Sequence, residues 1–241
     1  MRGLGTVLNL ATVALGGALG VVIGAHLPER MRRSIMQGLG LVVVAVAVVG
    51  FEPLTDPRLG LRRFVIMIVG VIAGAVVGEA LRLEDRLENA GEALRARVAP
   101  RADQDRGRFV DGFVVASTVF CVGPLTVLGA IEDGLGESVR LLAIKSSLDG
   151  IAAAGFAAVY GWGVLGSLVT IALLQGSLTL AAVLLAPVMT AEVLAELGAV
   201  GSLLVLGIGL RLLDVAHIRV VNLLPAIVMA PLVAGVADAV L

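Results

Sequence analysis

Long apolar runs without charged residues recur along the chain and alternate with short polar segments. A helix that crosses a bilayer needs about 20 mainly apolar residues, so each run of that length predicts one span. The fold class predicted is therefore all-α, a polytopic bundle of transmembrane helices with about eight spans, or seven as the alternative. The candidate spans are residues 3–25, 35–52, 62–81, 109–131, 139–159, 163–187, 193–213 and 219–240.

Three interruptions are expected within these runs. The stretch from Gly150 to Ala191 has no charged residue, and as one helix it would be roughly 60 Å long, about twice the hydrocarbon thickness. It must fold back, and the segment 161–163 (Gly-Trp-Gly) is the predicted hinge. Helices broken near Pro124 and Pro225 are also predicted, because proline has no N–H and its ring clashes with the preceding turn.

Four parts are predicted along the chain, and one of them is a polar segment. Leucines at helical spacing in residues 82–108 predict an amphipathic helix and linker that lies against the membrane or a partner subunit, with a plain solvated linker as the alternative. The other parts are a first three-span unit at 1–81, a central two-span unit with polar motifs at 109–159, and a last three-span unit at 160–241.

Two weak internal matches predict inverted repeats. Glu29 aligns with Glu192 at an offset of 163, and Thr12 aligns with Thr118 at an offset of 106. Five spans separate the starts of the first and sixth helices, so repeats of spans 1–3 and 6–8 would run in opposite directions. Inverted repeats with a site near the midplane are common among secondary transporters. Chance matching in a chain rich in Gly, Leu and Val is the alternative.

Composition and charge narrow the class of protein. With 59% hydrophobic residues, 15% charged residues and a mean hydropathy of +1.03, the chain is too apolar for a water-soluble globule. A net charge of −1 without a basic block argues against a nucleic-acid partner. Most arginines fall on the side of the membrane that carries residues 82–108, which predicts that this side is cytoplasmic and that both termini are outside.

The candidate chemistry centres on two charges within one predicted span. Lys145 and Asp149 are four residues apart, so they share a helical face and can pair. Charges inside a bilayer are costly and usually functional, although an ion pair that only locks helices together is the alternative. The predicted ion- or substrate-binding set, near the midplane between spans one, four, five and eight, is Asn9, Ser117, Thr118, Cys121, Gly123, Pro124, Lys145, Ser146, Asp149 and Asn222.

Other patterns support weaker expectations. A break at Pro124 would free backbone groups at membrane depth, which can bind an ion or substrate; a simple proline kink is the alternative. Residues 131–137 are expected to form an acidic outer turn, in which Glu132 and Asp133 are solvated or attract a cation. A glycine at every fourth position of 70–78 allows close helix contacts within the subunit or between two, which would make a homodimer.

Several chemistries have no sequence signal. His26 and His217 stand apart at span ends and Cys121 is alone, so no metal site is expected. The chain has no phosphate-binding Gly-Lys-Ser/Thr loop and no Gly-x-Ser-x-Gly elbow. We therefore expect neither an enzyme nor a bound cofactor.

An ordered set of motifs extends over nearly the whole chain, at residues 5–9, 111–117, 121–124, 129–134, 145–150 and 219–226. Together these motifs resemble the YqgA-type bacterial inner-membrane proteins. That family is catalogued as a domain of unknown function, so the resemblance implies a bacterial plasma (inner) membrane location and no substrate.

These observations lead to one principal hypothesis, a secondary, ion-coupled transporter of a small ion or polar metabolite embedded in the lipid bilayer. Lys145 and Asp149 would pair in the unliganded state, and an ion or anionic group would compete for one partner. A small-ion channel is the first alternative. The second is a non-transporting assembly or scaffold protein, whose working surface would be the 82–108 helix.

Overall fold

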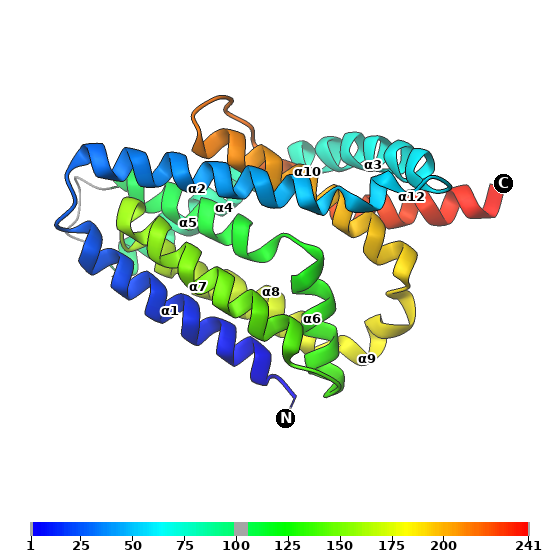
Figure 1. Cartoon of the computed structure of the whole chain (residues 1–241), viewed down its shortest axis with the longest axis horizontal. Helices are drawn as coiled ribbons and strands as arrows, with labels where there is room; N and C mark the ends of the chain where they lie inside the picture. The colour runs from blue at the N-terminus through cyan, green and yellow to red at the C-terminus, as the bar shows by residue number, and fades with distance from the viewer. Residues whose placement is uncertain (1, 99–105, 241) are drawn as a thin grey trace. The chain divides into compact units, whose positions relative to one another are not determined.

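The computed structural model describes residues 2–98 and 106–240, and within these residues the chain is helical and contains no strand (Figure 1). Seven helical segments are long and apolar enough to cross a membrane: α1 (Leu4–Gly24), α2 (Glu29–Gly50) with its extension η1 (Glu52–Thr55), α3 (Gly60–Leu81), α7 (Arg140–Tyr160), α8 (Gly163–Leu180), α10 (Ala191–Leu212), and α11 (Val220–Leu223) together with α12 (Ala226–Val240). The all-α, polytopic fold class is confirmed.

A further apolar segment is bent rather than straight. Helices α5 (Arg106–Cys121) and α6 (Pro124–Leu135) meet at an angle of 63° across a short break. The remaining elements are α4 (Leu83–Val98), α9 (Ala182–Leu185) and the 3₁₀ turn η3 (Ala186–Val188). The predicted hinge at 161–163 is also present, since α7 ends at Tyr160 and α8 begins at Gly163.

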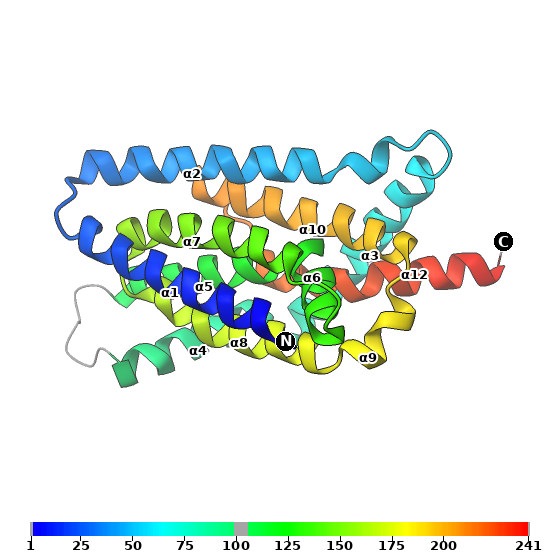
Figure 2. The ribbon, with the colours of Figure 1, turned by 60° about the horizontal axis from the view of Figure 1, so that its bottom comes forward.

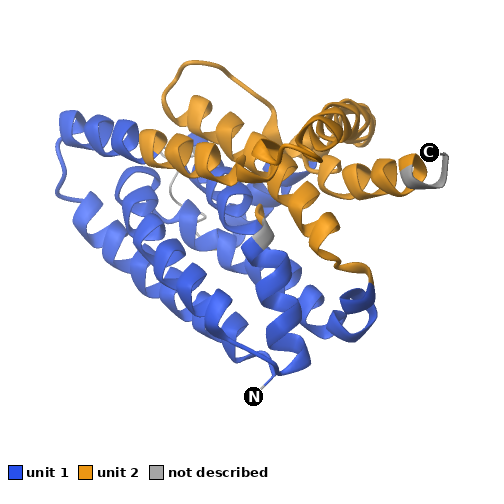
Figure 3. Cartoon of the chain, turned by 45° about the vertical axis from the view of Figure 1, so that its right-hand side comes forward, with its two compact units in different colours: residues 1–39, 86–121, 125–187 blue, residues 40–85, 122–124, 188–241 orange. Residues whose placement is uncertain are grey.

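The chain forms two compact units, each assembled from segments far apart in the sequence (Figure 3). Unit 1 consists of residues 1–39, 86–121 and 125–187, and unit 2 of residues 40–85, 122–124 and 188–241. Helix α2 contributes its first part to unit 1 and its second part to unit 2.

Within unit 1, α1 and α7 lie side by side (Figures 1 and 2). A Cβ atom on Gly16 would lie 2.0 Å from the carbonyl oxygen of Gly150, and one on Gly24 would lie 2.4 Å from that of Ala158. Only residues without side chains allow backbones to approach so closely. Because residue numbers rise together along both helices, α1 and α7 run in the same direction.

The bent pair α5–α6 runs beside α8 from one end to the other. A Cβ atom on Gly163, at the start of α8, would lie 2.0 Å from the carbonyl oxygen of Phe109 in α5. A Cβ atom on Gly134, at the end of α6, would lie 2.2 Å from the carbonyl oxygen of Thr179 near the end of α8. The bent pair therefore crosses once instead of returning to the side it entered. If the pair returned to the side it entered, the next helix, α7, would run in the direction opposite to α1. The two helices run in the same direction. With the bent pair counted as one span, the described residues contain eight candidate spans by length and composition.

Within unit 2, the glycine row of α3 packs against α11 and α12. A Cβ atom on Gly78 would lie 1.8 Å from the carbonyl oxygen of Asn222, and one on Gly70 would lie 2.9 Å from the Cα atom of Ala230. Residue numbers rise along one helix and fall along the other, so the pair is antiparallel. The glycine row is thus covered by the same chain and is not free to bind a second subunit.

The break predicted near Pro225 is present as a short interruption. Helix α11 ends at Leu223 and α12 begins at Ala226, so only two residues separate them. Pro231 lies inside α12 without ending it.

Large apolar side chains remain exposed along the spans, as expected for surfaces that face lipid. Val49 is 76% exposed, Leu61 79% and Leu180 89%. Soluble monomers rarely leave apolar surface of this extent in contact with water. Length, hydropathy and exposure together identify a multi-pass membrane protein.

The polar segment after α3 is a separate helix, α4. Arg82 has φ +48°, in the left-handed region, and this turn ends α3 before α4 begins at Leu83. A Cβ atom on Gly91 would lie 2.7 Å from the ring of Phe113 in α5. Part of the apolar face of α4 therefore packs within unit 1. The predicted end of this helix near Pro100 lies outside the described residues.

The close contact between α1 and α7 predicts a strong penalty for one added methyl group. In Gly20→Ala, the new Cβ would lie 2.2 Å from the carbonyl oxygen of Ala154, and we expect a loss of about 1–3 kcal/mol of stability because the helices must separate. Gly38→Ala is the matched control, since no atom lies within 4 Å of its Cβ position. Thermal unfolding in detergent measures both, and equal melting temperatures would contradict the contact.

Candidate functional site

The candidate site begins at the break between α5 and α6. Helix α5 ends at Cys121 and α6 starts at Pro124, and between them Gly123 has φ +136°, a backbone conformation that favours glycine. The last carbonyl groups of a helix have no partner within it. The broken helix predicted near Pro124 is therefore present, and it leaves acceptors open inside the span.

Lys145 of α7 binds one of these open acceptors. Its Nζ donates a hydrogen bond of 2.8 Å to the carbonyl oxygen of Phe120 and also pairs with the carboxylate of Asp149. The lysine is only 5% exposed and the aspartate 8%. A positive charge at the C-terminal end of a helix is stabilised by the helix dipole. Lys145 thus satisfies both the broken helix and the buried carboxylate.

Two amides complete the group around Asp149. The Nδ2 of Asn9 in α1 donates to Asp149 at 3.2 Å and to the Oε1 of Gln175 in α8 at 2.9 Å. Asn9 and Gln175 are both buried. Among the described residues, the Oδ1 of Asn9 and the Nε2 of Gln175 have no hydrogen-bond partner. We call Asn9, Lys145, Asp149, Gln175 and the Phe120 carbonyl the central cluster; all of it belongs to unit 1.

The unpartnered atoms of the central cluster are informative. A buried polar atom that makes no hydrogen bond costs about 1–3 kcal/mol, so such atoms in a native protein require an explanation, such as a bound water or ion. One acceptor (on Asn9) and one donor (on Gln175) remain available beside the ion pair. These two atoms are available to a bound water, an ion or a small polar group.

The hydroxyl groups of the predicted site differ in what they bond to. Ser117 accepts a hydrogen bond of 2.8 Å from Thr170 of α8, which links α5 to α8. Thr118 donates to the carbonyl oxygen of Val114 at 2.7 Å, and Ser146 donates to that of Leu142 at 2.5 Å. These last two hydroxyls therefore bond to their own helices. Cys121 is half-buried at the end of α5.

Asn222 does not belong to the central cluster, since it lies in unit 2 and bonds to residues there. Its Oδ1 accepts the backbone N–H of Glu84 at 2.8 Å, and its Nδ2 donates to Glu79 at 2.6 Å. Asn222 thus ties the end of α3 and the start of α4 to α11. It satisfies backbone and side-chain groups at a helix junction.

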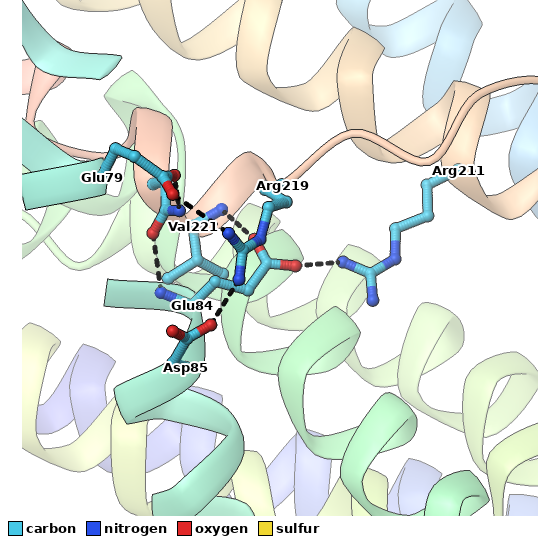
Figure 4. A network of polar contacts seen from close by, with 7 residues as sticks. Glu79, Glu84, Asp85, Arg211, Arg219 and Val221 are labelled. Carbon is cyan, nitrogen blue, oxygen red and sulfur yellow. Dashed lines mark hydrogen bonds and ion pairs between the residues drawn. The ribbon is translucent and has the colours of Figure 1, made fainter. Parts of the chain in front are cut away.

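The same junction holds two arginine contacts (Figure 4). Arg211 donates to Glu84 at 2.7 Å, and both side chains are largely buried. Arg219 pairs with Glu79 at 3.2 Å and with Asp85, and these three side chains are partly exposed. The two arginines therefore differ in how much water screens their charges.

The expected acidic outer turn is wrong for Glu132 and Asp133. Both lie in the last turns of α6, which continues to Leu135. Asp133 is completely buried and accepts the backbone N–H of Thr6 at 3.2 Å. The helix continues because residues 131–135 pack against neighbouring helices, which the composition of the segment did not reveal.

Sequence reasoning missed two side chains of this region. Gln175 is a polar residue within a predicted apolar span, so its residue type was a usable signal. Thr170 gives a weaker signal of the same kind, because threonine is common in spans. The Phe120 carbonyl is one of the backbone groups that a break at Pro124 was expected to free. In the described parts of the chain, no group of three His, Cys, Asp or Glu side chains could hold a metal ion.

The chain matches one protein family and two known proteins over most of its length. Residues 4–235 match the family described as "Protein of unknown function (DUF554)". The chain is 31% identical over 230 residues to the "Uncharacterized protein YqgA" of Escherichia coli (strain K12), covering 94% of each chain. It is 25% identical over 229 residues to the "Uncharacterized membrane protein YdfK" of Bacillus subtilis (strain 168), covering 95% of this chain and 94% of that one. No solved structure matches.

The junction in unit 2 predicts unequal effects for its two arginines. Arg211→Ala should cost about 3 kcal/mol or more, because it leaves the charge of Glu84 buried without its partner. Arg219→Ala should cost less than about 1 kcal/mol, because its ion pairs are partly exposed to water. Thermal unfolding of both variants in one detergent measures the difference, and the reverse order of stability would refute this account of the junction.

Proposed function

We propose that this chain, which belongs to the DUF554 family, is an ion-coupled secondary transporter of a small ion or polar metabolite. One observation carries the proposal: the Lys145 ammonium group is bound where a free cation would bind. It contacts a main-chain carbonyl oxygen at the open end of a broken helix, together with a buried carboxylate. Discontinuous helices with such carbonyl groups form the ion sites of many transporters.

The oxygen atoms of the central cluster are suited to a small cation. Hard cations prefer carboxylate, main-chain carbonyl and amide oxygens, and Asp149, the Phe120 carbonyl and Asn9 supply one of each. The Oδ1 of Asn9 is already available. A cation that binds these oxygens must displace the ammonium group of Lys145.

Displacement of Lys145 gives a physical mechanism for coupling. Once the cation neutralises Asp149, the ammonium group has lost its counter-charge inside a largely apolar span, where an unpaired charge is costly. An anionic or polar group on a substrate would then stabilise it. Binding of the cation and of the substrate would favour each other, and by linkage the effect is equal in both directions.

Burial favours a transporter over a channel. Lys145 and Asp149 are each less than one-tenth exposed, so the cluster is closed to water in this conformation. A channel would require an open polar path past these residues, whereas a carrier that alternates its exposure passes through a closed state. The scaffold alternative gives Lys145 and Asp149 only a structural role, and it requires bound water to satisfy the unpartnered atoms of Asn9 and Gln175.

The membrane arrangement is part of the proposal. The side that carries residues 82–108 and most arginines would face the cytoplasm, with both termini outside, in the inner membrane of a bacterium. Eight crossings let spans 1–3 and 6–8 run in opposite directions, as inverted repeats require. The repeat and a homodimer remain predictions.

Cation-dependent stability tests the proposed function. In Lys145→Met, a sodium ion or a proton can take the place of the ammonium group, so we expect the melting temperature to rise when sodium replaces choline at constant ionic strength, or when the pH falls. A ligand that binds only the folded state at 100 times its Kd adds about 2.7 kcal/mol. The double variant Lys145→Met/Asp149→Asn should lose this dependence, and Ser147→Ala, on an exposed position of α7, is the control.

A purely structural ion pair predicts a different pattern. Lys145→Met and Asp149→Asn would then each be destabilised by about 3–5 kcal/mol, because each leaves a buried charge unpaired. The double variant would recover part of the loss, and none of the variants would respond to sodium or to pH more than Ser147→Ala does. That pattern would refute the transporter proposal in favour of the scaffold.

A further inference from the structure

A second buried carboxylate lies in unit 1, apart from the central cluster. Asp133 of α6 is 0% exposed, and the backbone N–H of Thr6 donates to its Oδ2 at 3.2 Å. Its Oδ1 has no hydrogen-bond partner among the described residues, and no ion pair to it is formed there. Because an isolated ionised carboxylate is very costly to bury, Asp133 needs a positive charge or a proton that the surrounding side chains do not supply.

The residue that donates to Asp133 also carries a hydroxyl group. The hydroxyl groups of Thr6 in α1 and Thr179 in α8 lie 3.0 Å apart and share a hydrogen bond. A Cβ atom on Gly5 would lie 2.7 Å from the side chain of Leu142 in α7 and 3.2 Å from the carboxyl carbon of Asp133. Asp133 and the fully buried side chain of Leu142 thus both lie close to Gly5.

The two polar groups of unit 1 lie on common helix faces. Along α1, Thr6 precedes Asn9 by three residues, a rise of about 4.5 Å; along α8, Gln175 precedes Thr179 by four residues, a rise of about 6 Å. Residues three or four apart on a helix are neighbours on its surface. The polar side chains of α1 and α8 thus form one column, from Asp133 at the end where α1 begins to the central cluster.

We infer that Asp133, Thr6 and Thr179 form an outer site for a small monovalent cation, a proton or a sodium ion, on the route to Lys145 and Asp149. This inference rests on the proposed function, because it supplies the path by which the coupling cation reaches the central cluster. The cation neutralises Asp133 first and then moves past the unpartnered Oδ1 of Asn9 to Asp149. Leu142 separates the two sites on the α7 side.

The charged groups that face this column are few among the described residues. Helix α6 contributes Asp133, and α7 contributes Lys145 and Asp149. Helices α1 and α8 contribute only the neutral side chains of the column. Arg2 approaches the turn at Gly136, where a Cβ atom would lie 3.5 Å from its Cγ, but it forms no ion pair with Asp133.

The test is the variant Asp133→Asn in the full chain, purified in detergent. Asparagine keeps an oxygen that can accept from Thr6 and removes the charge. We expect it to melt at or above the native temperature in choline buffer at pH 8, where no cation neutralises the native carboxylate. Glu132→Gln makes the same charge change at a half-buried neighbouring position and should behave like the native protein.

The cation response separates the two candidate ions. If the cation is sodium, the native melting temperature rises from choline to sodium chloride at constant ionic strength and pH. If it is a proton, the native melting temperature rises from pH 8 to pH 6 in choline, because binding of the cation at the outer site stabilises the folded state. In both cases Asp133→Asn should raise the cation concentration needed for half the shift at least tenfold. Thr179→Val, which removes one hydroxyl without changing charge, should weaken the same response.

The outcomes distinguish this inference from the proposed function. If Asp149→Asn abolishes the native response while Asp133→Asn and Thr179→Val leave it intact, the outer site is wrong and the central site stands. If Asp133→Asn melts well below the native protein in choline at pH 8, the carboxylate is structural and the outer site is also wrong. If Glu132→Gln loses the melting-temperature response to the cation as fully as Asp133→Asn does, the response reflects the overall charge of the protein. That result would overturn the outer site.

Discussion

The break between α5 and α6 is the constraint on which unit 1 depends. A helix interrupted inside a membrane leaves carbonyl groups without partners, and these must be satisfied by protein or by a cavity. The ammonium group of Lys145 satisfies the Phe120 carbonyl, and its own charge requires Asp149. Asp149 in turn accepts from Asn9, which reaches Gln175. Four helices are thereby joined around one ion pair.

Close backbone contacts make this arrangement possible. The glycine row of α1 lets it approach α7 so closely that Asn9 reaches Asp149 directly. In unit 2, the glycine row of α3 has the same effect on α11, where Asn222 bonds to the junction between α3 and α4. In both units a polar amide lies at a contact formed by small residues. The difference is that Asn222 has its partners, whereas one oxygen of Asn9 has none.

The sequence predicted the spans and the broken helices, because hydropathy and proline act locally. It also paired Lys145 with Asp149, since four-residue spacing places side chains on one helix face. It did not show which distant residues meet them: Asn222 was grouped with Asn9 by residue type and lies in the other unit. Asp133 was expected at a solvated turn, because an acidic, glycine-rich segment is typical of one. Its burial depends on the packing of α1 and α8 against α6, which no local pattern encodes.

Displacement of Lys145 from Asp149 by a cation, as proposed above, would move charge across part of the membrane. Solid-supported membrane electrophysiology of proteoliposomes measures such movement directly, without a known substrate. The account predicts a transient current after a jump in sodium or proton concentration, and its loss in Asp149→Asn reconstituted at equal density. A folded native protein that gives no current with either cation, or the same current as Asp149→Asn, would contradict it.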